Sequence, residues 1–80
     1  MVDQKDVRGL RTARTEMSKR GIDIARSDLQ LRHGVLMVRG VIVPMPGSNI
    51  SDVKIEMDHI ARLLRQKPEI REVILDCKYQ

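Results

Sequence analysis

Two segments with different hydrophobic patterns meet at His33-Gly34. Residues 28–32 alternate between polar and apolar side chains, whereas residues 35–43 are mostly apolar. His33-Gly34 has the length of a two-residue hairpin turn, in which glycine supplies a positive φ. A turn there sets Asp28 opposite Arg39, a favourable charge pair. It also places four apolar side chains on one face, which we predict is the core face: Leu29, Leu31, Leu36 and Val38.

Helical spacing of apolar residues precedes this hairpin, over residues 3–20. The expected core positions are Val7, Leu10, Ala13, Met17 and the stem of Arg14. Gly9 lies inside this helix, where glycine costs about 1 kcal/mol relative to alanine. Gly21 followed by Ile22 is typical of a helix stop in the left-handed conformation. We therefore predict one amphipathic helix and treat residues 22–27 as a connection.

A second helix and a last strand follow the hairpin. Pro44, Pro46 and Gly47 end the hairpin strand, and Asn49 or Ser51 can cap a helix that runs to about Gln66. Its core stripe is Val53, Met57, Ile60, Ala61 and Leu64. Residues 71–79 alternate again and predict a strand, with one face made of Val73, Leu75, Cys77 and Tyr79.

These elements predict an α+β fold in the order α-β-β-α-β. A three-stranded mixed sheet with two helices packed on one face buries each apolar surface once. The 80 residues make a single domain, 1–80, with a core of about residues 5–79.

Two glycines in the hairpin carry a family resemblance. Gly34-Val35 and Gly40-Val41 form a G-V-x-x-x-x-G-V run between two amphipathic helices, and residues 71–79 follow as a final strand. In this arrangement the chain resembles a BON domain, a small bacterial module. The resemblance implies the α-β-β-α-β fold, attachment to phospholipid or binding of a partner, and no catalytic residues.

Charge and composition narrow the class of protein. The net charge is +4 at pH 7, and residues 1–40 contain nine lysines and arginines against five acidic residues. The chain has no tryptophan or phenylalanine, so its core is aliphatic. The single cysteine excludes an internal disulfide and fits a reducing compartment. The first residues are polar and charged rather than an apolar signal segment, and we expect a cytoplasmic protein.

No pattern in the chain predicts catalysis, a metal or a cofactor. The candidate ligands His33, His59 and Cys77 lack metal-site spacing. Asp52, Glu56 and His59 share a helical face, but charged helix faces are usually only solvated. We predict a non-enzymatic binding module in which Cys77 is a small core residue.

The outer face of the predicted sheet is the leading candidate for binding. Side chains on that face are Val35, Met37, Arg39, Val41 and Val43, with Gln30, Arg32 and Ile74 beside them. Two helices cover one side of such a sheet, so this side exposes an apolar strip that fits a protein partner or a homodimer. Alternatively, the proline-rich loop or the N-terminus folds over the strip, or strand propensity alone explains the valines.

The basic side of the first helix is a second candidate. Arg8, Arg11 and Lys19 share one face and could bind an anionic phospholipid surface. A third candidate, nucleic-acid binding of the KH type, ranks last, because the GXXG clamp and aromatic stacking residues are missing.

Overall fold

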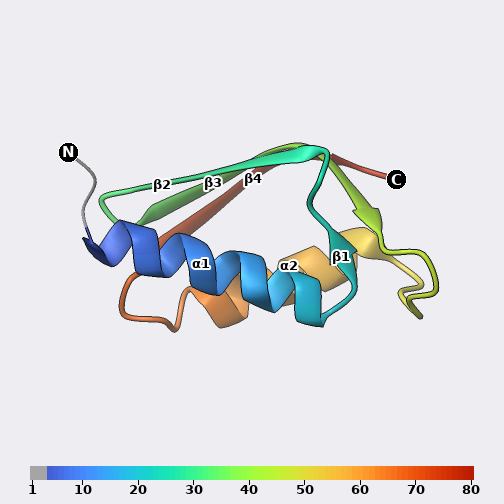
Figure 1. Ribbon diagram of the computed structural model, residues 1–80, viewed down its shortest axis with the longest axis horizontal. Helices are drawn as coiled ribbons and strands as arrows, with labels where there is room; N and C mark the ends of the chain where they lie inside the picture. Colours follow the sequence, from blue (N-terminus) through green and yellow to red (C-terminus); the bar gives the residue numbers. More distant parts are fainter. Residues whose placement is uncertain (1–3) are drawn as a thin grey trace.

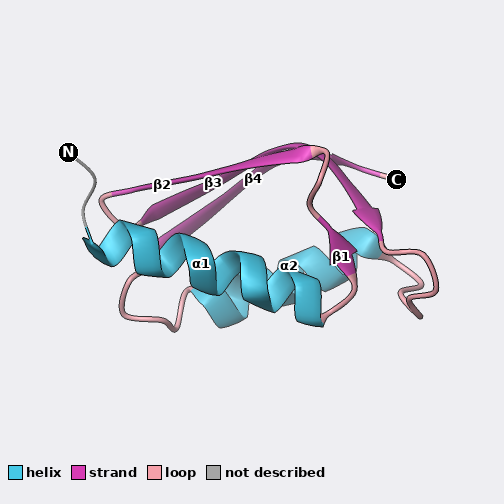
Figure 2. Ribbon diagram, in the orientation of Figure 1, coloured by secondary structure: helices cyan, strands magenta, loops and turns pink. Residues whose placement is uncertain are grey.

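Two helices lie under one face of a curved sheet in the computed structural model, which describes residues 4–80 (Figures 1 and 2). The elements are α1 (Gln4–Lys19), β1 (Ile22–Asp23), β2 (Ser27–Arg32), β3 (Val35–Pro44), α2 (Val53–Leu64) and β4 (Glu72–Tyr79). Asp3, the expected start of the first helix, lies outside the described residues. The prediction of an α+β fold with both helices on one side of the sheet is confirmed.

The β2–β3 hairpin has the predicted register. Asp28 pairs with Arg39, Leu29 with Val38 and Leu31 with Leu36. His33 and Gly34 have φ values of 51° and 81°, as a two-residue turn with two left-handed residues requires. The four predicted core side chains of the hairpin are all buried: Leu29, Leu31, Leu36 and Val38.

β4 pairs with the other edge of β3 and runs parallel to it. The connection between these two parallel strands contains α2, as parallel pairing requires a crossover. Val73 is buried, and the side chains at alternate positions along β4 pack against the core: Leu75, Cys77 and Tyr79. The predicted inward face of the last strand is therefore confirmed.

Residues 22–27, expected to be a connection, contain a fourth strand of the sheet. β1 pairs Ile22 with Pro44 and Asp23 with Val43 of β3. β2 then pairs Ser27 with Gly40, so residues 24–26 place one extra residue beside β3. That extra residue reverses the alternation, and Ile22 and Leu29 both face inward although one is even and the other odd. A two-residue strand is too short to produce an alternating pattern, which is why it was missed.

Gly40 has a different role from the one its position suggests. The alternation of β3 places Gly40 on the inner face, where it was expected to leave room for a helix. Its φ is instead +96°, and its nearest neighbours are Arg26 and Ser27. A Cβ at Gly40 would lie 2.6 Å from the carbonyl oxygen of Arg26. Val41 N–H donates to that same oxygen at 3.1 Å. Gly40 thus permits the bend at which pairing passes from β2 to β1.

α1 contacts the sheet through its small residues. Gly9, Ala13 and Met17 are its buried positions. A Cβ at Gly9 would lie 2.5 Å from Cδ2 of Leu31, so glycine allows this close approach. The expected core positions of Val7 and Arg14 are wrong, because both residues are exposed.

The N-cap of α2 lies one residue after Ser51 and three after Asn49, the two expected caps. Asp52 is the N-cap, and its Oδ1 accepts a hydrogen bond from Ile55 N–H at 3.2 Å. Asn49 and Ser51 therefore do not have the expected capping role. The predicted core stripe of α2 is confirmed, since each of its members is buried: Val53, Met57, Ile60, Ala61 and Leu64.

Replacing Gly40 by alanine tests the bend. We expect Gly40→Ala to reduce the free energy of unfolding by about 2–4 kcal/mol, because it combines left-handed strain with a backbone clash. Gly47→Ala is the matched control: its φ is +83° and nothing lies within 4 Å of the added Cβ. It carries the strain alone, about 1 kcal/mol. Urea unfolding followed by circular dichroism measures both, and equal losses would contradict this role of Gly40.

Candidate functional site

The outer face of the sheet is not covered by the proline-rich loop. Met45 N–H donates to the carbonyl oxygen of Gly21 at 2.8 Å, and Ile50 packs against the core. These contacts hold the loop near the end of α1, below the sheet (Figure 1). The alternative in which this loop folds over the strip is therefore wrong. Residues 1–3, the rest of the proposed N-terminal cover, lie outside the described part of the chain.

The predicted binding residues form one row along β3. Val35, Met37, Val41 and Val43 are each half-buried, and Arg39 between them is exposed. Residues paired across a sheet lie on the same face, so the register names their neighbours. Val35 lies between Arg32 and Glu72, and Met37 lies between Gln30 and Ile74. The candidate site is thus an apolar row with polar residues on both sides, which we call the outer strip.

Arg39 interrupts the outer strip with a charge that is already paired. Its Nε lies 3.8 Å from Oδ2 of Asp76 on β4. The expected neighbour Asp28 is in register with Arg39, but its Oδ2 accepts a hydrogen bond from Gln30 Nε2 at 3.3 Å. Both side chains of the Arg39–Asp76 pair are more than half exposed, so the pair contributes little to stability.

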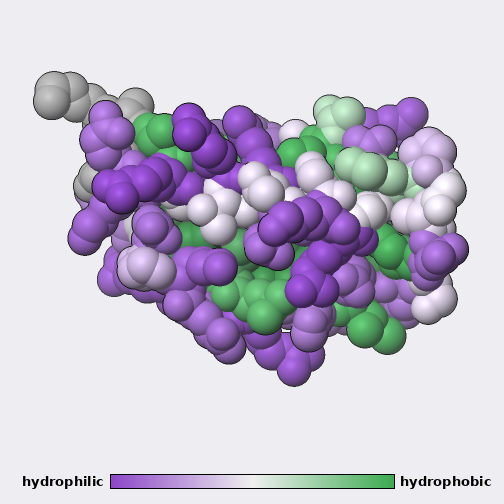
Figure 3. Space-filling model, turned by 60° about the horizontal axis from the view of Figure 1, so that its bottom comes forward, coloured by the Kyte–Doolittle hydropathy of each residue, from purple (hydrophilic) through white to green (hydrophobic). Residues whose placement is uncertain are grey.

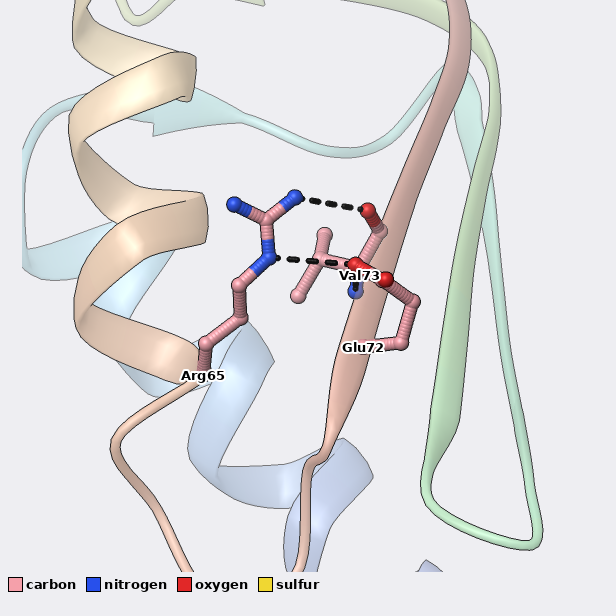
Figure 4. Close-up of polar contacts among 3 residues, drawn as sticks. All are labelled: Arg65, Glu72 and Val73. Carbon is pink, nitrogen blue, oxygen red and sulfur yellow. Dashed lines mark hydrogen bonds and ion pairs between the residues drawn. The ribbon is translucent and has the colours of Figure 1, made fainter.

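The free edge of β4 is protected where the strand begins. Arg65, the C-cap of α2, places its Nε 3.1 Å from Oε1 of Glu72 and donates from Nη2 to the carbonyl oxygen of Val73 at 3.1 Å (Figure 4). Glu72 Oε1 also accepts a hydrogen bond from Val73 N–H at 2.9 Å. Both backbone groups of Val73 are therefore occupied, which prevents another strand from pairing at this point.

The predicted anion-binding residues lie together on the solvent side of α1. Arg8, Arg11 and Lys19 are exposed and follow one helical face. Arg20 is instead paired with acidic residues. Its Nε lies 3.8 Å from Oε2 of Glu16, and its Nη1 lies 3.5 Å from Oε1 of Glu56 on α2. Seen from the helix side, hydrophilic surface surrounds smaller apolar areas (Figure 3).

A groove between α1 and β2 was missed in the sequence. It has a volume of about 290 Å³, and its lining is Asp6, Val7, Leu10, Arg11, Arg14, Thr15 and Leu31. Val7 is 38% exposed, which makes it one of the most exposed large apolar side chains of the described residues. The error in the predicted core residues of α1 hid this groove. The buried side of α1 contains Gly9, Ala13 and Met17, so Val7 lies at the margin of the helix–sheet contact and not within it.

The candidate catalytic residues are not brought together. Asp52 caps α2 and Glu56 pairs with Arg20, so both have structural roles, whereas His59 is exposed. Within residues 4–80 no three potential metal ligands cluster. Partial burial raises the pKa of Tyr79 well above its usual range, with Cys77 and Asp58 adding to the shift. The predictions of no catalysis, metal or cofactor stay predictions.

No protein-family model, curated protein or solved structure matches this chain. The resemblance to BON domains therefore stays a prediction. Among the described helices, α1 and α2 included, none combines the length and apolar character needed to cross a membrane.

A pair of neighbouring substitutions tests the assignment of the two faces of β3. Leu36 is fully buried and Met37 half-buried on the opposite face. We expect Leu36→Ala to reduce the free energy of unfolding by about 2–5 kcal/mol, and Met37→Ala by less than about 1 kcal/mol. Thermal and urea unfolding measure both. A larger loss for Met37→Ala would mean that the outer strip belongs to the core.

Proposed function

We propose that this chain is a non-enzymatic interaction module that binds a second copy of itself through the outer strip. The observation that carries the proposal is the apolar row on the central strand, which no described element covers. Val35, Met37, Val41 and Val43 lie on the strand that every other strand of the sheet pairs with. A dry contact there would remove apolar surface from water. The resemblance to BON domains is consistent with a binding module.

The charges beside the outer strip support a second copy as the ligand. Along β4 the outward positions include Glu72, whose Oε1 already pairs with Arg65, at one end and Lys78 at the other. A twofold axis across the strands, between the levels of Met37 and Arg39, sets Glu72 opposite Lys78 of the second copy, and does so twice. The same operation sets Val35 opposite Val41 of the second copy. It also sets Met37 opposite Arg39 of the second copy, so the valine pairs and the Glu72–Lys78 pairs lie at the two ends of the contact and the Arg39–Asp76 ion pairs lie beside its axis.

The size of this face predicts a weak dimer. Strands β2, β3 and β4 have 6, 10 and 8 residues. Three strands of that mean length cover roughly 14 Å by 26 Å, on the order of 400 Å² for a flat face. A stable interface buries about 800 Å² on each partner, so this contact belongs to the transient class. We expect a dissociation constant on the order of 0.1 mM.

Sedimentation equilibrium from 10 µM to 1 mM tests self-association. We expect wild-type chain to dimerise over this range, and Met37→Asp and Val41→Asp to stay monomeric with unchanged circular dichroism, because a buried carboxylate opposes the contact. Ile55→Asp is the matched control, since Ile55 is 65% exposed on α2, away from the outer strip. A wild-type monomer at 1 mM, or equal loss in the control, would contradict the proposal.

The second candidate, an anionic lipid surface, is favoured by one observation. Arg8, Arg11 and Lys19 lie on the solvent side of α1, where they can meet phosphate headgroups. Thr15 shares that face, and Val7 beside it is only 38% exposed, so α1 offers little apolar surface for insertion into a bilayer. Any such binding is electrostatic, at about 1 kcal/mol for each basic side chain near the surface. This candidate therefore ranks second.

Vesicle flotation tests the lipid candidate. With phosphatidylserine vesicles at 20 mM salt we expect at most partial binding that is lost at 300 mM, because salt screens exposed charges. Neutral phosphatidylcholine vesicles are the control, and the triple variant Arg8→Glu, Arg11→Glu, Lys19→Glu should not bind. Binding that is indifferent to salt would contradict an electrostatic contact.

A further inference from the structure

We infer that the free edge of β2 and the groove beside it bind an extended peptide segment that carries an apolar residue and, two positions on, an acidic residue. The site differs from the outer strip, because the groove lies between α1 and β2 and opens at the edge of the sheet. The proposal joins three observations: unpaired backbone groups, an apolar floor and two arginines.

The backbone of β2 leaves a short stretch of its edge unpaired. The hairpin register directs the N–H and C=O groups of Asp28, Gln30 and Arg32 toward β3, so those of Leu29 and Leu31 point to the opposite edge. No hydrogen bond within residues 4–80 occupies these four groups. Such an edge accepts an added strand.

Both ends of this stretch are closed. On one side His33 N–H donates to Oδ2 of Asp6 at 3.3 Å. On the other side Ser27 N–H and Oγ donate to the carbonyl oxygen of Ile24 at 3.1 and 2.8 Å. The open edge is therefore limited to two pairing residues, Leu29 and Leu31, which suits a short segment and opposes extended strand-to-strand aggregation.

The groove determines which side chains the peptide carries. Side chains of an added strand that face the helices enter the groove, whose lining from residue 6 to residue 15 of α1 rises about 14 Å, the length of about four extended residues. Val7, Leu10 and Leu31 form its apolar part. Arg11 and Arg14 follow one turn further along α1. Residues that share a face of a strand are two positions apart. A peptide with an apolar residue beside Val7 and Leu10 therefore fits best when the residue two positions on is acidic and lies beside Arg11 and Arg14.

Charge argues against a second copy at this site. A twofold contact between two β2 edges would bring Arg11 and Arg14 of one copy close to the same arginines of the other, and like charges at an interface disfavour it. The β4 edge is a poorer site, because Arg65 and Glu72 occupy the backbone groups of Val73. The acidic peptide is the ligand that satisfies the edge, the apolar floor and the arginines together.

A nuclear magnetic resonance titration of the ¹⁵N-labelled full chain at 150 mM salt tests this inference. The probe is the peptide acetyl-Ser-Thr-Val-Thr-Asp-Thr-Ser-amide, in which valine meets the level of Leu31 and aspartate the level of Leu29. We expect saturable shifts for the amides of residues 29–31 and 6–15. Shifts centred on residues 41–43 or 75–79 instead, or no saturable shift up to 5 mM peptide, would overturn it.

Two altered peptides separate edge pairing from general attraction. N-methylation of the valine removes one backbone donor and keeps the side chain, and replacement of aspartate by lysine reverses the charge. We expect each to weaken binding at least about tenfold. Binding of either peptide as tight as that of the probe would overturn the inference.

Variants of α1 locate the charge requirement. The double variant Arg11→Glu, Arg14→Glu should weaken binding of the probe peptide at least about tenfold, because both residues line the groove. Val7→Lys should also weaken binding, because Val7 belongs to the apolar part of the groove. Arg8→Glu is the matched control on the same helix outside the groove, with an expected change below about threefold. All four positions are exposed, and circular dichroism checks folding. Equal loss of peptide binding in Arg8→Glu would overturn the inference. Binding to phosphatidylserine vesicles without any peptide shifts would overturn it in favour of a membrane surface.

Discussion

The register between β2 and β3 is the constraint on which the rest of the structure depends. Because side chains alternate with a period of two, a slip of β2 by one residue against β3 would move Leu29 and Leu31 from the core to solvent. The turn that sets the register is held from outside: His33 N–H donates to Asp6 of α1, and Arg71 Nε donates to the carbonyl oxygen of His33 at 3.0 Å. Arg71 N–H also donates to the carbonyl oxygen of Gly34 at 2.8 Å. The first helix and the residue before the last strand thus fix the same turn.

The patterns of apolar residues predicted the structural features that depend on residues close together in the sequence. The hairpin register followed from a two-residue turn and an alternating strand, and the core stripe of α2 from helical spacing. Features set by contacts distant in sequence were not predictable in this way. Gly9 reads as a defect in an isolated helix, but it is the point where α1 approaches Leu31. β1 has only two residues, and its pairing with β3 depends on the extra residue between positions 23 and 27.

The same distinction applies to the candidate sites. The residues of the outer strip were assigned from the alternation of β3, because the face that a side chain occupies is a local property. Prediction of the groove would have required the orientation of α1 on the sheet. That orientation is set by the buried residues Gly9, Ala13 and Met17, whereas Val7 and Leu10 line the groove. An apolar residue in an amphipathic helix can therefore lie at the margin of the core, where it forms the wall of a site.

The two edges of the sheet differ in which backbone groups are already hydrogen-bonded, and the proposed peptide site rests on this difference. At β4 a guanidinium and a carboxylate occupy the backbone of Val73, which removes a pairing position. At β2 the hydrogen bonds from His33 to Asp6 and from Ser27 to Ile24 lie on either side of Leu29 and Leu31, whose own backbone groups stay open within the described part of the chain. A chain protected only against aggregation would gain from covering these two residues as well.

The outer strip and the groove can be occupied at the same time, because one opens on the face of the sheet and the other at its edge. A dimer formed through the outer strip would carry two grooves related by its twofold axis. A ligand with two acidic segments would then bind the second groove at the effective concentration set by its linker, which is in the millimolar range for short flexible linkers. Binding of such a ligand would in turn favour the dimer, since it prefers the state that offers both grooves. Weak self-association through a face of about 400 Å² and weak peptide binding at a two-residue edge would therefore strengthen each other.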